Sequence, residues 1–308
     1  MRRSTPWLLL LTLALLPCGG ASAQTAQPPR AKQPEGNPPP PLFPKHRRGL
    51  YINHDNVEVI DATPQSPPLT TDDPGVPDKG EYEINLLTEA DLGADARSVN
   101  VLAVDANYGL VLKGWGHDLP AQLKFEVPIA AASEAGNPYQ VGLGHSALGV
   151  KFNFYNDESR GFRVSVYPQM EFSTAAGVEK GVAEPGQTFV LPLLISHEAK
   201  YATLVGNAGF SKAIHGAGRD STVDFSAGMG RAFWPKLAVM GEIYTSSATN
   251  LRDDRMVSMN AGVIYGVRKS IWYARIGHSL FSDDGSHTFL AVGIKVLFDT
   301  EHKSGAQP

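Results

Sequence analysis

The sequence predicts an all-β protein: a closed antiparallel up-and-down transmembrane β-barrel of about 12 strands, behind a disordered Pro-rich leader. Between residues 80 and 298, apolar and polar residues alternate in segments of eight to twelve residues, close to the roughly 9–11 residues that a tilted strand needs to cross a bilayer. The connections between these segments alternate between short and long, as in outer-membrane barrels. The chain of 308 residues also begins with the features of an export signal.

Residues 1–23 are predicted to be a signal peptide. Arg2 and Arg3 precede an apolar run over residues 7–16, and the small residues 21–23 (ASA) follow it. This run is too short to span a bilayer, which needs about 20 apolar residues. Cleavage is expected after residue 23, and a lipoprotein modified at Cys18 is the alternative.

Cysteine content and charge exclude several classes of site. Cys18 is the only cysteine and leaves with the signal peptide, so the mature chain is expected to have no disulfide, thiolate metal site or cysteine nucleophile. The formal net charge of −4 gives no basic footprint for nucleic acid. No later apolar run reaches the length of a transmembrane helix, and no cofactor or metal is expected.

Residues 24–79 are rich in proline and poor in apolar clusters. Such a stretch buries too little apolar area to offset its ordering entropy, so it is predicted to be a disordered periplasmic leader. Residues 50–60 (LYINHDNVEVI) are the part of it that could form a short element. Whether the leader is a tether, plugs the lumen or binds a periplasmic partner stays open, and residues 299–308 are predicted to be a polar tail.

Residues 80–298 are predicted to be the barrel. The clearest alternation covers residues 162–173, where Val164 and Val166 share one face while Arg163 and Ser165 share the other. Three prolines inside proposed strands remove ladder donors, so bulges or strand ends are expected at Pro128, Pro168 and Pro192. The proposed strands are centred roughly on residues 85, 103, 125, 150, 167, 192, 205, 227, 241, 261, 274 and 293.

Alternation alone also fits a soluble barrel with its apolar face inward. Short connections near residues 156–157 and 235–236, and long ones such as residues 174–187, favour the membrane barrel, although the turn around residues 114–116 looks longer than expected. An even number of strands lets both termini face the periplasm. Aromatic residues beside the short connections are predicted to form an interfacial girdle: Trp115, Trp234, Tyr265, Trp272 and Phe298.

If the apolar face meets lipid, the polar face lines the lumen. The predicted function is an outer-membrane channel or transporter for small solutes, with a charged constriction that selects them. The alternative is a non-conducting structural or binding barrel whose charges pair and fill the lumen. Lys151 and Arg163 are expected to touch an anionic or aromatic solute. The residues predicted to line the lumen are Lys124, Glu126, Lys151, Arg163, Glu171, Glu242, Arg275 and Lys295.

An enzymatic reading is not favoured. His145 and Ser146 suggest an outer-membrane hydrolase, but neighbouring residues on a strand point to opposite faces, and no third group orients the histidine. His197 and Glu198 lack the second histidine of a zinc-binding helix. A hydrolase therefore remains only a remote alternative.

Several segments resemble one family of outer-membrane proteins. Residues 68–75 (PLTTDDPG) and 80–85 (GEYEIN) resemble the opening of the family known as the MetA-pathway of phenol degradation, and residues 141–152 resemble its glycine-rich entry into a strand. His145 stands where this family commonly has an acidic residue. Later matching segments are residues 191–194, 206–210 and 240–244.

This resemblance implies a transporter-like β-barrel in the outer membrane of a Gram-negative bacterium. Outer-membrane lipid, lipopolysaccharide and a small solute, an aromatic or hydrophobic one among the candidates, would then be its partners. The phenol label describes a pathway and does not identify the solute.

Overall fold

The computed structural model describes residues 50–52, 58–93, 96–114, 117–134, 137–215 and 221–299, all within one compact unit that spans residues 41–308. Residues 1–23, Trp115 and residues 300–308 lie outside this description, so the signal peptide, one girdle tryptophan and most of the tail are not tested. No helix in the described part of the chain is long and apolar enough to span a membrane.

Antiparallel strands make up nearly all of the described structure, as alternating sequence with a period of two predicts. A small hairpin precedes the barrel, formed by β1 (Leu50–Ile52) and β2 (Glu58–Ile60). The barrel strands are β3 (Glu81–Gly93), β4 (Ala96–Gly114), β5 (His117–Glu134), β6 (Gln140–Leu143), β7 (Ser146–Asp157), β8 (Phe162–Val166), β9 (Gln169–Phe172), β10 (Gln187–Glu198), β11 (Thr203–His215), β12 (Ser221–Trp234), β13 (Leu237–Ala248), β14 (Met256–Val267), β15 (Ser270–Ser282) and β16 (His287–Asp299).

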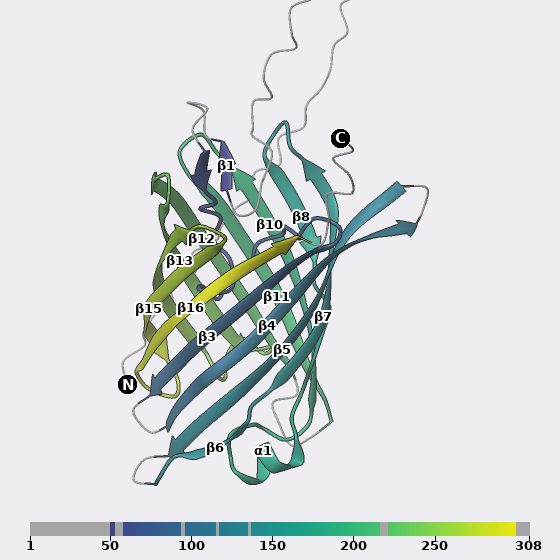
Figure 1. The fold of residues 1–308 in the computed structure, drawn as a ribbon. Helices are drawn as coiled ribbons and strands as arrows, with labels where there is room; N and C mark the ends of the chain where they lie inside the picture. The colour runs from purple at the N-terminus through teal and green to yellow at the C-terminus, as the bar shows by residue number, and fades with distance from the viewer. Residues whose placement is uncertain are drawn as a thin grey trace, which may run out of the picture. The chain divides into compact units, whose positions relative to one another are not determined.

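The sheet closes on itself because β16 pairs with β3 along its whole length, from His287↔Gly93 to Asp299↔Glu81. β6 and β7 share one strand position beside β5, and β8 and β9 share the next one beside β7. The result is a closed barrel of 12 strands in meander order (Figure 1). Eleven of the twelve predicted strand centres fall within observed strands, and the one at residue 167 falls in the break between β8 and β9. The predicted fold class is confirmed.

The three prolines coincide with the two interruptions of the sheet. Pro168 lies between β8 and β9, as expected for a residue that ends a strand. Pro192 in β10 faces the same break, where its carbonyl accepts the Tyr167 N–H at 3.0 Å. Pro128 in β5 faces the break between β6 and β7, and its carbonyl accepts the Gly144 N–H at 3.0 Å. Each missing donor therefore lies where the neighbouring strand is already interrupted.

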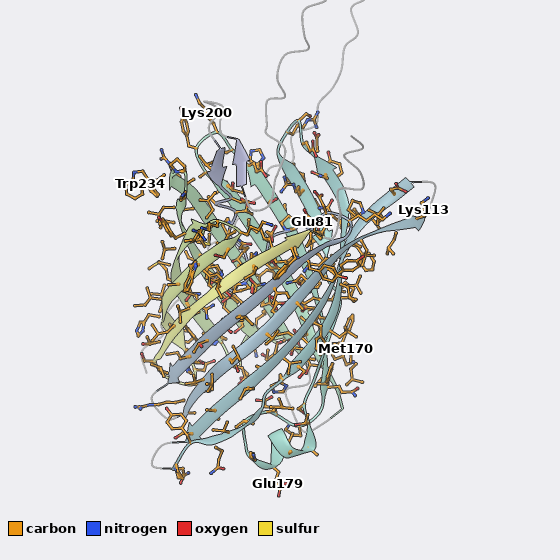
Figure 2. All side chains as sticks on the ribbon, in the orientation of Figure 1. Glu81, Lys113, Met170, Glu179, Lys200 and Trp234 are labelled. Carbon is orange, nitrogen blue, oxygen red and sulfur yellow. The ribbon has the colours of Figure 1, made fainter. Side chains whose placement is uncertain are left out.

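The two ends of the barrel differ in their connections. At the short-turn end, β12 and β13 are joined by residues 235–236, and β14 and β15 by residues 268–269. The turn from β4 to β5 also spans only residues 115–116, so the expected longer turn there is wrong; the strands simply extend further. At the long-loop end, residues 173–186 join β9 to β10 and contain α1 (Ala175–Glu179). Lys200 and Trp234 mark the first end and Glu179 the second (Figure 2).

Large apolar side chains cover the outside of the barrel, on the face opposite the buried polar residues. Phe125, Phe225, Met259, Ile276 and Val292 are examples, and each stays about half exposed or more. An outer surface this rich in apolar side chains is suited to contact with lipid hydrocarbon rather than with water. Four of the predicted girdle residues are also exposed and lie toward the short-turn end: Trp234, Tyr265, Trp272 and Phe298.

Closure can be tested with a disulfide across the β3–β16 seam. Leu86 and Ile294 are direct partners on the outer face, and directly opposed strand residues lie within disulfide reach. With Cys18 replaced by Ser, Leu86→Cys with Ile294→Cys is expected to oxidise to an intramolecular disulfide, detected by thiol alkylation and intact mass. The control pair Leu86→Cys with Leu193→Cys, on strands that do not pair, is expected to keep both thiols free. Free thiols in the first pair would contradict the seam.

Candidate functional site

The lumen contains a stretch of the chain that was predicted to be disordered. Residues 60–79, here called the inner segment, enter at the short-turn end, where the Ile60 N–H donates to the Pro235 carbonyl at 2.8 Å. Ile60 and Leu69 are fully buried and pack in one cluster with Met240, Ile264 and other inward residues. The expectation of a disordered leader is therefore wrong for this part, because the barrel supplies the apolar contacts that the segment lacks by itself.

Glu242 on β13 holds the middle of the inner segment. Its two carboxylate oxygens accept the Thr70 N–H at 2.8 Å and the Thr71 N–H at 2.6 Å. Asn260 on β14 donates to the same carboxylate at 2.6 Å. Glu242 is 3% exposed, so these charge-assisted bonds are shielded from water. The Glu242 carboxylate thus takes the place of a neighbouring strand for two adjacent backbone amides. These two hydrogen bonds are here called the clamp.

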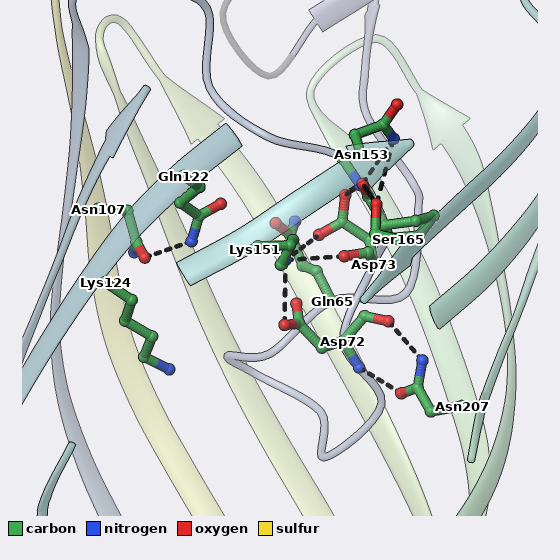
Figure 3. Close-up of polar contacts among 12 residues, drawn as sticks. Gln65, Asp72, Asp73, Asn107, Gln122, Lys124, Lys151, Asn153, Ser165 and Asn207 are labelled. Atoms are coloured by element: carbon green, nitrogen blue, oxygen red, sulfur yellow. Dashed lines mark hydrogen bonds and ion pairs between the residues drawn. The ribbon is translucent and has the colours of Figure 1, made fainter. Parts of the chain in front are cut away.

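Lys151 on β7 binds the next two residues of the inner segment (Figure 3). Its ammonium lies 3.0 Å from an Asp72 carboxylate oxygen and donates to the Asp73 carbonyl at 2.8 Å. The same ammonium lies 5.0 Å from the centre of the Tyr167 ring. Asp73 belongs to the inner segment and not to a strand; desolvation raises the pKa of Asp73 to about 6, against the opposing attraction of Lys151.

Amide and hydroxyl side chains complete the grip on this turn of the chain. Asn207 on β11 accepts the Asp72 N–H at 2.7 Å and donates to the Asp72 carbonyl at 2.8 Å (Figure 3). Asn153 donates to the Pro74 carbonyl at 2.9 Å, and Ser165 donates to the same oxygen at 2.5 Å. Backbone groups of residues 70–74 thus find partners on four different strand positions, as buried peptide groups require.

Two inward glycines leave room for the inner segment. A Cβ at Gly230 on β12 would collide with the Ala62 carbonyl, and a Cβ at Gly109 on β4 would collide with the carbonyls of Pro77 and Asp78. The absence of a side chain therefore lets the strand backbone approach the segment directly.

Most of the residues predicted to line the lumen point inward, but some contact the inner segment and others border a cavity. Lys295 pairs with Glu83 at 2.7 Å and donates to Gln65 of the inner segment at 2.6 Å. Arg275 lies 3.4 Å from both Glu89 and the Thr70 hydroxyl. With Lys151 and Glu242, these residues act on the inner segment.

Arg163 does not fit its predicted role. Its guanidinium pairs with Glu198 at 2.9 Å near the short-turn end, and it does not border the main cavity. Lys151 does not border that cavity either, because the inner segment engages it. The expectation that these two cations meet the solute is therefore not supported.

A polar cavity of about 720 Å³, here called the vestibule, lies between the inner segment and the long-loop end. Lys124, Glu126 and Glu171 of the predicted set line it. Lys124 pairs with Glu126 at 3.1 Å and approaches Asp105, at the edge of a buried amide network, to 3.9 Å. Tyr167 also lines the vestibule, on the face where alternation over residues 162–173 places it with Arg163. Sequence reasoning missed three other lining side chains, although alternation along their strands could have found the first two: Asp224, Tyr244 and Asn207.

The loop over residues 173–186 borders the vestibule through Val182 and Glu184. Lys180 donates to the Val141 carbonyl at 2.8 Å, and the Glu184 N–H donates to His145 Nε2 at 2.9 Å. His145 lies just before β7 and lines the vestibule, whereas Ser146, the first residue of β7, is buried and is not among the lining residues, so the arrangement does not favour a nucleophile–base pair.

Comparison of the fold with solved structures finds bacterial outer-membrane channels. An outer-membrane channel from Pseudomonas putida F1 is 11% identical, with a TM-score of 0.58 over 73% of this chain and 97% of that chain. The NanC porin is 10% identical with a TM-score of 0.47, covering 69% of this chain and 98% of that one. The KdgM porin is 11% identical with a TM-score of 0.45, covering 70% and 99%.

These likenesses bear on the fold and not on the solute. At 11% identity, the Pseudomonas putida channel shows a shared fold alone. The two porins have TM-scores below 0.5, so nothing about this chain is inferred from them. No family model matches the chain, and no curated protein matches it. The resemblance to the phenol-degradation family therefore stays a prediction.

Replacing Glu242 by Ala is expected to loosen the inner segment. The change leaves the amides of Thr70 and Thr71 without acceptors, and each buried unpaired donor costs about 1–3 kcal/mol. Hydrogen–deuterium exchange at these two amides should then accelerate strongly. Glu171→Ala, a carboxylate of the vestibule with no bond to the inner segment, is the matched control and should leave the exchange unchanged. Equal exchange in all three proteins would show that Glu242 does not hold the segment.

Proposed function

We propose that this chain is an outer-membrane channel for small solutes in a Gram-negative bacterium, closed on its periplasmic side by the inner segment. The observation that carries this proposal is a polar vestibule of about 720 Å³ inside a closed barrel whose lumen also holds the inner segment, which in the described structure is not a strand of the barrel sheet. A cavity of this size suits a small ligand.

The proposed location rests on the outer surface and on the ends of the chain. Exposed apolar side chains surround the barrel, and aromatic residues gather toward the short-turn end. Short turns face the periplasm in barrels of this type. The signal-like residues 1–23 supply the export route, and lipid with lipopolysaccharide would surround the barrel.

The inner segment suits a movable closure because polar contacts hold its residues 70–74. The clamp at Glu242, the Lys151–Asp72 ion pair and the Asn207 amide can each exchange their partners for water. The net stabilisation from each hydrogen bond of this kind is about 0.5–1.5 kcal/mol, or about 1.5–3 when a charged group takes part. The apolar contribution comes from the buried side chains of Ile60, Ala62, Leu69 and the prolines at positions 64, 68 and 74.

The same inner segment favours one other function. A barrel whose lumen is filled at one end could be a non-conducting structural or binding protein, and the paired charges along the wall are compatible with that role. The two functions differ in a single measurable property, which is passage through the barrel.

A reversible lock on the inner segment is expected to abolish conductance. Pro74 and Ser165 are in contact, so Pro74→Cys with Ser165→Cys, in a chain with Cys18 replaced by Ser, can tether the segment to β8 while Lys151, Asp72 and Glu242 stay intact. In a planar lipid bilayer, the oxidised protein should show no unitary steps. Reduction should restore the steps of the parent protein.

Ser165→Cys alone is the control, and its conductance should be the same in the oxidised and the reduced state. Conductance through the verified oxidised tether would overturn closure by the inner segment. Absence of steps in the parent, in the reduced double variant and in Glu242→Ala would overturn the channel and favour the structural barrel.

A further inference from the structure

The vestibule is lined by five acidic side chains and a single lysine among the residues that border it. The carboxylates of Asp72 and Glu126 are already paired, with Lys151 and Lys124. Within the described part of the chain, no cationic side chain lies within ion-pair distance of the remaining acidic residues, which are Glu171, Glu184 and Asp224.

Glu126 and Glu171 are held on either side of a small residue. Glu126 pairs laterally with Ala147, and Ala147 pairs in turn with Glu171. At about 4.8 Å per strand, the two backbones lie roughly 10 Å apart along the wall. The alanine between them leaves the space in front of the wall open. Asp224 lies further around, where its carboxylate leans over the bare backbone of Gly209. The acidic groups thus surround the vestibule, as in pores that select cations.

An orphaned hydroxyl also points to a ligand. Tyr167 borders the vestibule and is 2% exposed, yet its hydroxyl has no hydrogen-bond partner in the described structure. A buried unpaired hydroxyl is costly, and a bound donor would satisfy it. A second aromatic ring, that of Tyr244, borders the same cavity.

A bare metal ion is a poor candidate for this site. No group of three or more His, Cys, Asp or Glu side chains in the described residues is placed to hold a metal ion. The acidic groups are instead distributed around a cavity with aromatic rings. That arrangement matches a larger cation with an apolar part, since ammonium groups are attracted both to carboxylates and to aromatic faces.

We infer that the vestibule binds a small organic ammonium compound, with its cationic group near Glu171 and Asp224 and in reach of the Tyr167 hydroxyl. This inference names the class of solute for the proposed channel, and in that respect it rests on the proposed function. The site itself can be tested without any passage through the barrel.

Three ligands of matched size test the charge preference on the full-length mature protein in detergent. Isothermal titration calorimetry at neutral pH compares benzylammonium, benzyl alcohol and benzoate. Benzylammonium is expected to bind about 10-fold or more tighter than benzyl alcohol, because only the cation gains the carboxylate and cation–π contacts. Benzoate is expected not to bind. Equal affinities, tighter binding of benzoate or no binding of benzylammonium would overturn the inference, whatever the behaviour of any variant.

Two variants test where the ligand binds. Glu171→Gln with Asp224→Asn is expected to weaken benzylammonium binding about 10-fold or more, and Tyr167→Phe about threefold to tenfold, the loss of one hydrogen bond. Glu158→Gln makes the same chemical change on the turn between β7 and β8, outside the vestibule, and should bind like the parent. Unchanged affinity in the double variant or in Tyr167→Phe would overturn the assignment.

Bilayer conductance of the same preparations separates the two proposals. Benzylammonium binding by a protein that never conducts would contradict the channel and keep the site. Conductance without benzylammonium binding would contradict the site and keep the channel.

Discussion

The Glu242 carboxylate supplies hydrogen-bond acceptors that the inner segment needs inside the barrel. A chain segment without regular structure carries peptide donors into a barrel whose own backbone groups are already paired to one another. At residues 70–72 side chains supply the acceptors, and Glu242 supplies two to adjacent amides that are 172 and 171 residues away in the sequence. The apolar packing of Ile60 and Leu69, the Lys151 ion pair and the Asn207 amide all depend on the path that this clamp imposes.

The two breaks in the sheet also lie beside the lumen. A proline removes a ladder donor, so Pro128, Pro168 and Pro192 are tolerated in a closed sheet only where a neighbouring strand is already broken. At one break the fully buried Tyr167 borders the vestibule, and at the other His145 receives the backbone of the loop over residues 173–186. Both strand breaks therefore lie beside the cavity.

The strands could be predicted from the sequence because alternation is a local property, repeated in every strand position. The strand predicted around residue 192 falls within β10 despite its proline. The inner segment could not be predicted, since a Pro-rich composition signals disorder and each of its partners is distant in the sequence. Likewise, alternation shows that Arg163 points inward, but not that Glu198 neutralises it far from the vestibule.

The two halves of the lumen meet at Asp72. This residue borders the vestibule, and its carboxylate also forms the 3.0 Å ion pair with Lys151 that helps to hold the inner segment. A cation bound near Glu171 and Asp224 therefore shares its cavity with a carboxylate that helps to hold the closure. Any free energy that couples the two is reciprocal: if closure lowers the affinity of the vestibule, the bound cation weakens the closure by the same factor.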